Sequence, residues 1–349
     1  MEAAYISTKG LNDANRLSVL RLQNRLLVAQ KEVATGRLAD AGKTLGARTS
    51  ETVSLRQQYD RFTVLAETNS IAETRLSVSQ SAISDMVKIG QDFVNAVLLA
   101  RDAEGGAGVS RQQAQASLTA LVDGLNTSVG GEFIFAGINT SVKPVATYDT
   151  TPSSPAQSSV AAAFLADFGT TQSDPANENI TPAAMQTFLD TTFAGLFDPA
   201  GWSADWSTAS DQNIVSRIGQ SEDVQSSANA NEAAFRKLAQ AFTMIADLGV
   251  ENLNRATFQT VAETATRLAS EAINELTVIQ GGLGNSEARI AATNEKLLAQ
   301  RNILNTQIDN LETVDPFEAS TRVTTLLTQL ETAYALTARV QRLSILNYI

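Results

Sequence analysis

The sequence predicts a mainly α fold: an elongated antiparallel helical bundle or coiled coil built from both termini, with a small inserted outer domain of α+β type. Three observations predict it. Apolar residues recur at helical spacings of three and four over long stretches near both ends of the chain. Aromatic residues make up only 6% of the sequence, while alanine, leucine and threonine are plentiful, which favours long helices with small side chains. Between residues 133 and 218 the helical spacing is interrupted by prolines.

The first predicted helix begins near Asn12 or Asp13, either of which can cap it, and ends at Gly36. Its apolar side chains form two neighbouring stripes. The first stripe contains Val19, Leu22, Leu26, Ala29 and Val33, and the second contains Leu17, Leu20 and Leu27. Without neighbouring molecules, such a terminal helix has more apolar surface than one partner helix can cover.

The most regular pattern runs from Phe62 to Ala100, where the three-and-four spacing persists over more than five heptads. It predicts a helix about 60 Å long, at roughly 1.5 Å per residue. The stripe includes Asn69, Ser79 and Gly90, which permit close approach of helices and suit a multi-helix bundle. We interpret this stripe as core within one chain. A shorter helix over residues 111–129 follows the break at Gly105-Gly106.

The C-terminal third repeats the helical pattern. It predicts one helix around Phe235–Ile245 and another over Phe258–Ile279, which ends at Gly281-Gly282. The spacing resumes from Ile290 and continues to a break at Asp315-Pro316. A last striped helix then runs almost to the end of the sequence.

The middle of the chain, residues 133–218, predicts the inserted domain. It contains six of the seven prolines and both tryptophans, Trp202 and Trp206, which we expect in its core. Residues 133–135 and 213–219 are predicted strands, and residues 150–160 a loop. From residue 144 to 216 there are eight acidic residues and no lysine or arginine, which indicates a solvated surface.

We therefore predict three parts: a terminal helical assembly domain (residues 1–40 and 316–349), a helical rod domain (41–132 and 219–315), and the inserted acidic outer domain (133–218). The boundaries follow the glycine and proline breaks and the change of composition.

Composition excludes several classes of function. A net charge of −11 argues against a nucleic-acid partner, because phosphate binding needs clustered lysine and arginine. The sequence has no histidine or cysteine, which removes imidazole and thiol catalysis and zinc sites built on nitrogen or sulfur. No cleavable signal peptide or membrane-spanning run is evident, so we expect no membrane association. No motif indicates an enzyme, cofactor or metal site.

Several segments resemble one family. The first helix contains Leu22-Gln23-Asn24-Arg25-Leu26 and ends in Ala34-Thr35-Gly36-Arg37. The turn Gly131-Glu132-Phe133-Ile134-Phe135-Ala136-Gly137 leaves the helical body, residues 230–235 re-enter it, and residues 338–349 close the chain. In their order and distances these segments are similar to the flagellin-like axial proteins of the bacterial flagellum, and within them to the hook–filament junction branch (hook-associated protein 3).

The resemblance implies a structural, non-enzymatic subunit that is exported through the flagellar type III apparatus to the extracellular flagellum. It implies as partners further copies of the chain in a ring, the hook-side junction protein, flagellin and an export chaperone. Two alternatives stay open: the filament flagellin itself, which shares the same plan, and a self-contained helical signalling or interaction module.

Under this interpretation the terminal stripes form the assembly interface. We expect both ends, up to about Gly36 and from about Pro316, to be disordered in the isolated monomer and to pair in the polymer. The residues predicted for the interface are Leu17, Val19, Leu22, Leu26, Val33, Leu326, Leu330, Leu336, Val340, Leu343 and Leu346.

Overall fold

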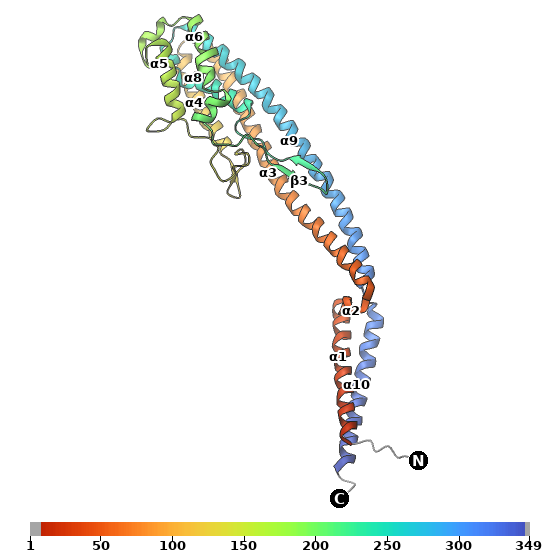
Figure 1. The fold of residues 1–349 in the computed structure, drawn as a ribbon. Coiled ribbons are helices and arrows are strands. Elements are labelled where there is room, and N and C mark those ends of the chain that lie inside the picture. Colours follow the sequence, from red (N-terminus) through yellow and green to blue (C-terminus); the bar gives the residue numbers. More distant parts are fainter. Residues whose placement is uncertain (1–7, 346–349) are drawn as a thin grey trace. The chain divides into compact units, whose positions relative to one another are not determined.

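A computed structural model describes residues 8–345 and confirms the mainly α fold (Figure 1). The helices are, in chain order, α1 (Thr8–Thr35), α2 (Ala41–Leu45), η1 (Gly46–Arg48), α3 (Thr49–Arg101), α4 (Gly106–Leu125), α5 (Pro155–Phe168), η2 (Pro175–Asn179), α6 (Pro182–Phe188), η3 (Leu189–Phe193), α7 (Pro199–Asp205), α8 (Ala233–Asp247), η4 (Val250–Asn252), α9 (Arg255–Glu312) and α10 (Pro316–Ile345).

The strands of the described residues form two antiparallel pairs, β1 (Ser128–Val129) with β2 (Glu132–Phe133), and β3 (Val215–Arg217) with β4 (Asp223–Gln225). β3 lies within the strand predicted at residues 213–219. The strand predicted at 133–135 is shorter than expected, because Ile134 and Phe135 leave β2 and are buried in the core.

The chain divides into two compact units. One comprises residues 1–64 and 297–349, and the other comprises residues 65–296. The division falls inside α3 and α9, so the first unit contains the start of α3 and the end of α9 in addition to the terminal helices. The three-part domain division derived from the sequence is a different partition and stays a prediction.

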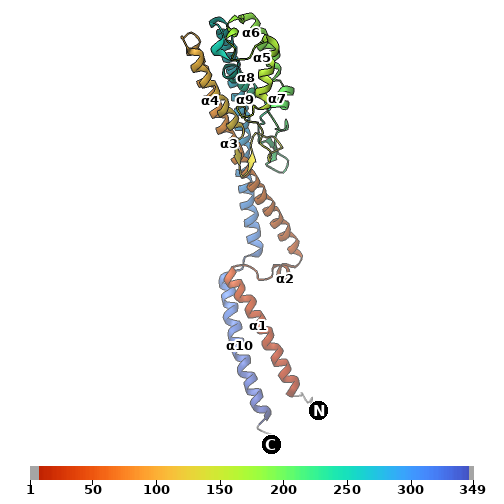
Figure 2. The same ribbon diagram turned by 90° about the vertical axis from the view of Figure 1, so that its left-hand side faces the viewer.

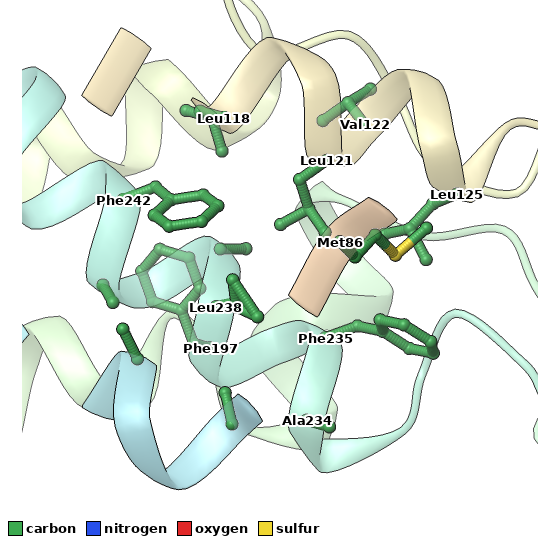
Figure 3. Packing of buried hydrophobic residues seen from close by; sticks show 14 of the residues in the cluster. Met86, Leu118, Leu121, Val122, Leu125, Phe197, Ala234, Phe235, Leu238 and Phe242 are labelled. Carbon is green, nitrogen blue, oxygen red and sulfur yellow. The ribbon is translucent and has the colours of Figure 1, made fainter. Parts of the chain in front are cut away.

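The core of the 65–296 unit contains most of the predicted stripe of α3. Leu76, Ile83 and Phe93 are fully buried, and the ring of Phe93 meets that of Phe242 edge to face, with centroids 4.7 Å apart. Figure 3 shows Met86 of α3 among side chains of α4 and α8, including Leu121 and Phe235. The stripe is therefore core within one chain, as predicted.

The polar and small members of the stripe have structural roles. Buried Asn69 donates through Nδ2 to the backbone oxygen of Ile218 at 3.0 Å and to Oδ1 of Asn294 at 2.8 Å. At Gly90 a Cβ atom would lie 3.0 Å from Cγ1 of Ile273, so only glycine allows this close approach of α9 to α3 without a shift.

The helix break predicted at Gly281-Gly282 was wrong, because α9 continues through it from Arg255 to Glu312. Leu276, Leu283 and Ile290 are all buried, so the apolar stripe of α9 passes through the glycines without a change of phase. Packing along the whole helix outweighs the cost of each glycine, about 1 kcal/mol relative to alanine.

Other helix ends follow the prediction more closely. α1 ends before Gly36, which adopts a positive φ of 67°, and α9 ends before the Asp315-Pro316 break. The side chain of Asp315 accepts the backbone N–H of Phe317 at 2.8 Å and so caps α10. The start of α1 was predicted too late, since the helix already begins at Thr8.

The inserted region is more helical than its composition predicted. Residues 150–160 were predicted as a loop, but α5 begins at Pro155, and Oγ of Ser154 caps it by accepting the N–H of Gln157 at 3.1 Å. Trp202 and Trp206 are buried and stacked with centroids 5.0 Å apart, which confirms their predicted place in the core.

Candidate interaction surface

The terminal helices α1 and α10 lie side by side in both views (Figures 1 and 2). Their contacts define an antiparallel register. Gln23 donates to the hydroxyl of Tyr334 at 2.7 Å, Arg322 donates to Glu32 at 2.9 Å, and Arg37 forms an antiparallel bridge with Thr313. The two helices therefore pair within one chain.

The apolar core of this pair is small. Its buried members are Leu26, Ala29 and Leu326, with partly buried Leu22, Val323 and Leu330 packed against them. The core of the 65–296 unit is several times larger. Each fully buried leucine contributes roughly 1.5–3 kcal/mol, so few side chains hold together two helices of 28 and 30 residues.

Much apolar surface of the pair stays exposed. Leu17, Leu20, Leu27 and Val28 of α1 are all exposed, and among the side chains of α10 that the structure describes Phe317 is 85% exposed. Isolated apolar side chains are normal on protein surfaces, whereas a contiguous group marks a surface that another molecule covers.

The predicted interface residues therefore separate into three groups. Leu26 and Leu326 are buried in the α1–α10 contact, and Val19, Leu22 and Leu330 are partly buried. Leu17, Val33 and Leu336 are exposed. Val340, Leu343 and Leu346 lie outside the residues whose side chains the structure describes. The first group holds the pair together, and the second remains available to a partner.

Two carboxylates anchor the pair at the end near Gly36. Glu32 is buried, pairs with Arg322 at 2.9 Å and accepts the backbone N–H of Ala39 at 3.4 Å. Glu312, whose side chain is 4% exposed, pairs with both Arg37 and Arg56. Such ion pairs fix geometry more than they add net stability, because burying the charges costs desolvation energy.

The hydrogen bonds from Arg56, reinforced by the charges of Arg56 and Arg37, outweigh burial and hold the pKa of Glu312 below its ordinary value. The same bonds raise the pKa of Arg56. Backbone bonds run beside them, from the N–H of Leu38 to the oxygen of Glu312 at 2.8 Å, and from the N–H of Val314 to the oxygen of Gly36 at 3.0 Å. These contacts fix the connections of the terminal helices to α2 and α9.

Sequence reasoning left part of this surface out of the interface. Leu20 and Leu27 belong to the second stripe of the first helix and are not among the predicted interface residues. Both are exposed leucines of α1. Threonines were overlooked entirely. In α10 five of them, Thr324, Thr325, Thr328, Thr332 and Thr337, line a groove of about 580 Å³. The signal available in the sequence was the recurrence of Thr325, Thr328 and Thr332 at spacings of three and four on one helix.

Two titratable groups with shifted pKa values, Tyr148 and Asp247, line a pocket of about 220 Å³ in the 65–296 unit. Burial raises the pKa of Asp247, while the hydroxyl of Tyr148 donates to it at 2.6 Å and opposes that rise. Burial and the nearby Asp247 charge also raise the pKa of Tyr148, which keeps its hydroxyl a donor. This hydrogen bond joins the end of α8 to the segment after Val145.

Neither a cluster of metal-ligating residues nor a helix capable of crossing a bilayer occurs among the residues that the structure describes. The surface of α1 and α10 keeps exposed apolar side chains after the two helices have paired.

Comparisons with known proteins match the two regions of the chain that contain α1 and α10. The family model described as the bacterial flagellin N-terminal helical region matches residues 6–140, and that of the bacterial flagellin C-terminal helical region matches residues 266–349. A search of curated protein sequences gives no significant match. A solved structure described as a "putative flagellar hook-associated protein" from Vibrio parahaemolyticus is similar in fold, with a TM-score of 0.52 at 8% identity. The match covers 76% of this chain and 97% of that one.

Proposed function

Because the chain belongs to the bacterial flagellin family, whose two helical regions together match well over half of it, we propose that this flagellar structural subunit joins the hook to the filament. In this role it assembles through its terminal helices with other copies of itself and has no enzymatic activity.

The observation that carries the proposal is the incomplete burial of the terminal helices. Both α1 and α10 lie within the regions that match flagellins, and both keep exposed leucines or phenylalanine after they have paired with each other. A structural subunit needs a surface that is tolerated in the monomer and becomes buried in the polymer. The predicted interface residues, from Leu17 to Val33 and from Leu326 to Leu346, are proposed to supply it.

The turn at Gly131–Gly137 and the ending Leu343-Ser344-Ile345-Leu346-Asn347-Tyr348 resemble the junction branch of the family and favour the junction over the filament. The solved structure of similar fold is described as hook-associated, which points in the same direction. The proposed neighbours are the hook-side junction protein and flagellin, with an export chaperone holding the chain before its export to the flagellum.

Copy number and a deletion strain test this proposal. Quantitative mass spectrometry of purified flagella should find about a dozen copies of the chain per flagellum, as expected for a ring one subunit thick. Cells that lack the chain should complete their hooks and release flagellin monomers into the medium. Thousands of copies per flagellum would instead assign the chain to the filament, which is the alternative function.

A second alternative is a helical signalling or interaction module. It predicts a monomer that remains monomeric at high concentration and is absent from purified flagella. Detection of the chain in washed flagella by mass spectrometry would exclude this alternative, and its absence from them would contradict the flagellar proposal.

A further inference from the structure

Three buried side chains of the inserted region form a continuous stack of oxidisable rings. The ring centroids of Trp202 and Trp206 are 5.0 Å apart, with an angle of 12° between the ring planes. The ring of Tyr148 lies on the other side of the contact, 5.0 Å from Trp206 at an angle of 18°. Among the aromatic contacts of the described residues, Trp202 therefore reaches Tyr148 through Trp206.

Nearly parallel rings in contact allow an electron to pass from one to the next, because their π orbitals overlap. The ring of Phe197 also lies near Trp206, at 5.4 Å, and further phenylalanines continue beyond it. A phenylalanine ring is far harder to oxidise than an indole or a phenol. An electron vacancy created in this stack therefore stays on Trp202, Trp206 and Tyr148.

The two ends of the stack differ in the partner of their polar atom. The hydroxyl of Tyr148 donates to Oδ2 of Asp247 at 2.6 Å, whereas Nε1 of Trp202 donates to the amide oxygen of Asn231 at 3.1 Å. A carboxylate can take up the proton of its donor, and a neutral amide cannot. Because a phenol that loses its proton on oxidation is the better electron donor, the vacancy is most stable on Tyr148.

Other tyrosines lack this arrangement. The hydroxyl of Tyr59 accepts a hydrogen bond from Arg301 at 3.5 Å, and that of Tyr334 accepts one from Gln23 at 2.7 Å. Within the part of the chain that the structure describes, neither hydroxyl bonds to a carboxylate. Both tryptophans of the sequence belong to the stack, and the sequence has no cysteine or histidine that could be oxidised instead.

The tyrosine end of the stack borders a pocket. Tyr148 and Asp247 line the pocket of about 220 Å³, together with Asp123 and Asp149, whereas Trp202 and Trp206 are only 1% and 2% exposed. A small solute therefore reaches the stack more easily at Tyr148 than at either tryptophan. The carboxylates favour a neutral solute over an anion.

We propose that Trp202, Trp206 and Tyr148 form a relay that moves one-electron oxidation out of the core and delivers it to Tyr148 beside the pocket. A peroxyl radical takes one electron from a tryptophan and becomes a peroxide anion. An electron from Tyr148 then restores the tryptophan, and the phenol proton moves to Asp247. The products are an intact tryptophan, a neutral tyrosyl radical and a protonated Asp247.

The relay is reset by a small neutral phenol from solution. The phenol gives one electron to the tyrosyl radical and loses its own proton to water, while the proton on Asp247 returns to the hydroxyl of Tyr148. The relay protects the fold and does not depend on assembly, so its failure would leave the proposed function standing.

Laser photoionisation of the full-length chain tests the relay, with light that tryptophan absorbs and tyrosine does not. The vacancy then starts in the stack, because the sequence has no tryptophan outside it. In the wild type, transient absorption should show the indole radical decaying as the tyrosyl radical grows. Tyr148→Phe removes one hydroxyl and leaves the rings in place, so the indole radical should persist and the tyrosyl signal should be lost. Tyr59→Phe is the matched control and should behave as the wild type.

Two variants of equal size test the path. Trp206→Phe removes the ring between Trp202 and Tyr148, so the tyrosyl signal should be lost although both end residues are present. Trp202→Phe leaves Trp206 in contact with Tyr148 and should keep the transfer. Circular dichroism checks that each variant is folded. Asp247→Asn retains a hydrogen-bond acceptor but not a base, and should slow the growth of the tyrosyl radical.

The relay would be overturned by a wild-type indole radical that persists, by growth of the tyrosyl radical in Tyr148→Phe, or by equal transfer in Trp206→Phe and Trp202→Phe. Unchanged growth in Asp247→Asn would refute the proton transfer to Asp247. Hydroquinone, a neutral phenol, should shorten the lifetime of the tyrosyl radical more than the ascorbate anion does at the same concentration. The reverse order would contradict the role of the pocket.

Discussion

The neighbouring residues Leu26 and Leu27 offer a test of what holds the terminal helices together. Leu26 is 8% exposed and belongs to the small core between α1 and α10, whereas Leu27 is 64% exposed. Replacing a buried leucine by alanine costs about 2–5 kcal/mol. We expect about 2 kcal/mol for Leu26→Ala, the lower limit, because a two-helix contact can collapse around the missing atoms.

A loss of about 2 kcal/mol raises the population of the separated helices roughly 30-fold. Hydrogen exchange measured by mass spectrometry should therefore accelerate by about that factor in residues 8–35 and 316–345. Exchange in the interior of residues 65–296 should not change, because that core is built from other side chains. Leu27→Ala is the matched control and should alter exchange in the monomer less than about twofold.

The reasoning fails in either of two cases. Unchanged exchange in the terminal helices of Leu26→Ala would mean that this core does not hold them together. Faster exchange throughout the 65–296 unit would mean that the two cores are not independent.

The remaining predictions concern charge and backbone geometry. Because the native pKa of Glu312 lies below its ordinary value of 4.5, its contribution to stability is complete above that value and is lost as the pH falls through the native pKa. Glu312→Gln should lower stability at neutral pH by about 1–3 kcal/mol and weaken this acid dependence, measured by thermal unfolding from pH 2 to 7. Gly137→Ala should lower the Tm markedly, since φ is +62° and a Cβ would lie 2.4 Å from the backbone oxygen of Ser210. Gly281 lies in a helix, and a Cβ added there would meet no atom within 4 Å, so Gly281→Ala should instead raise the free energy of unfolding by about 1 kcal/mol. A Gly281→Ala variant less stable than Gly137→Ala would contradict this account.

The sequence predicted correctly those helices in which the periodically spaced apolar residues are also the buried ones. The stripe of α3 was recognised from spacing alone, and Leu76, Ile83 and Phe93 are buried. It failed where packing overrides local propensity, as at Gly281-Gly282, and where a cap outweighs a loop-like composition, as at Ser154. In both places a contact distant in sequence or a single hydrogen bond decided the structure.

The interface could be predicted only in part, because periodicity places residues on a helix face but does not show which face the partner helix covers. Leu26 and Leu27 illustrate this limit. Both are apolar neighbours on one helix, and only the register of α1 against α10 separates the buried leucine from the exposed one. The acceptor that each threonine hydroxyl uses is likewise invisible in composition.

The backbone bonding of the threonines in α10 makes the character of this segment depend on its state. In an extended chain every hydroxyl is free to bind water, and the segment is as hydrophilic as its composition indicates. Once the helix forms, the same hydroxyls bond the backbone and their methyl groups face outward. On the proposed export of the chain before assembly, this segment would be well hydrated while it is extended and would expose an apolar surface only after it has formed a helix.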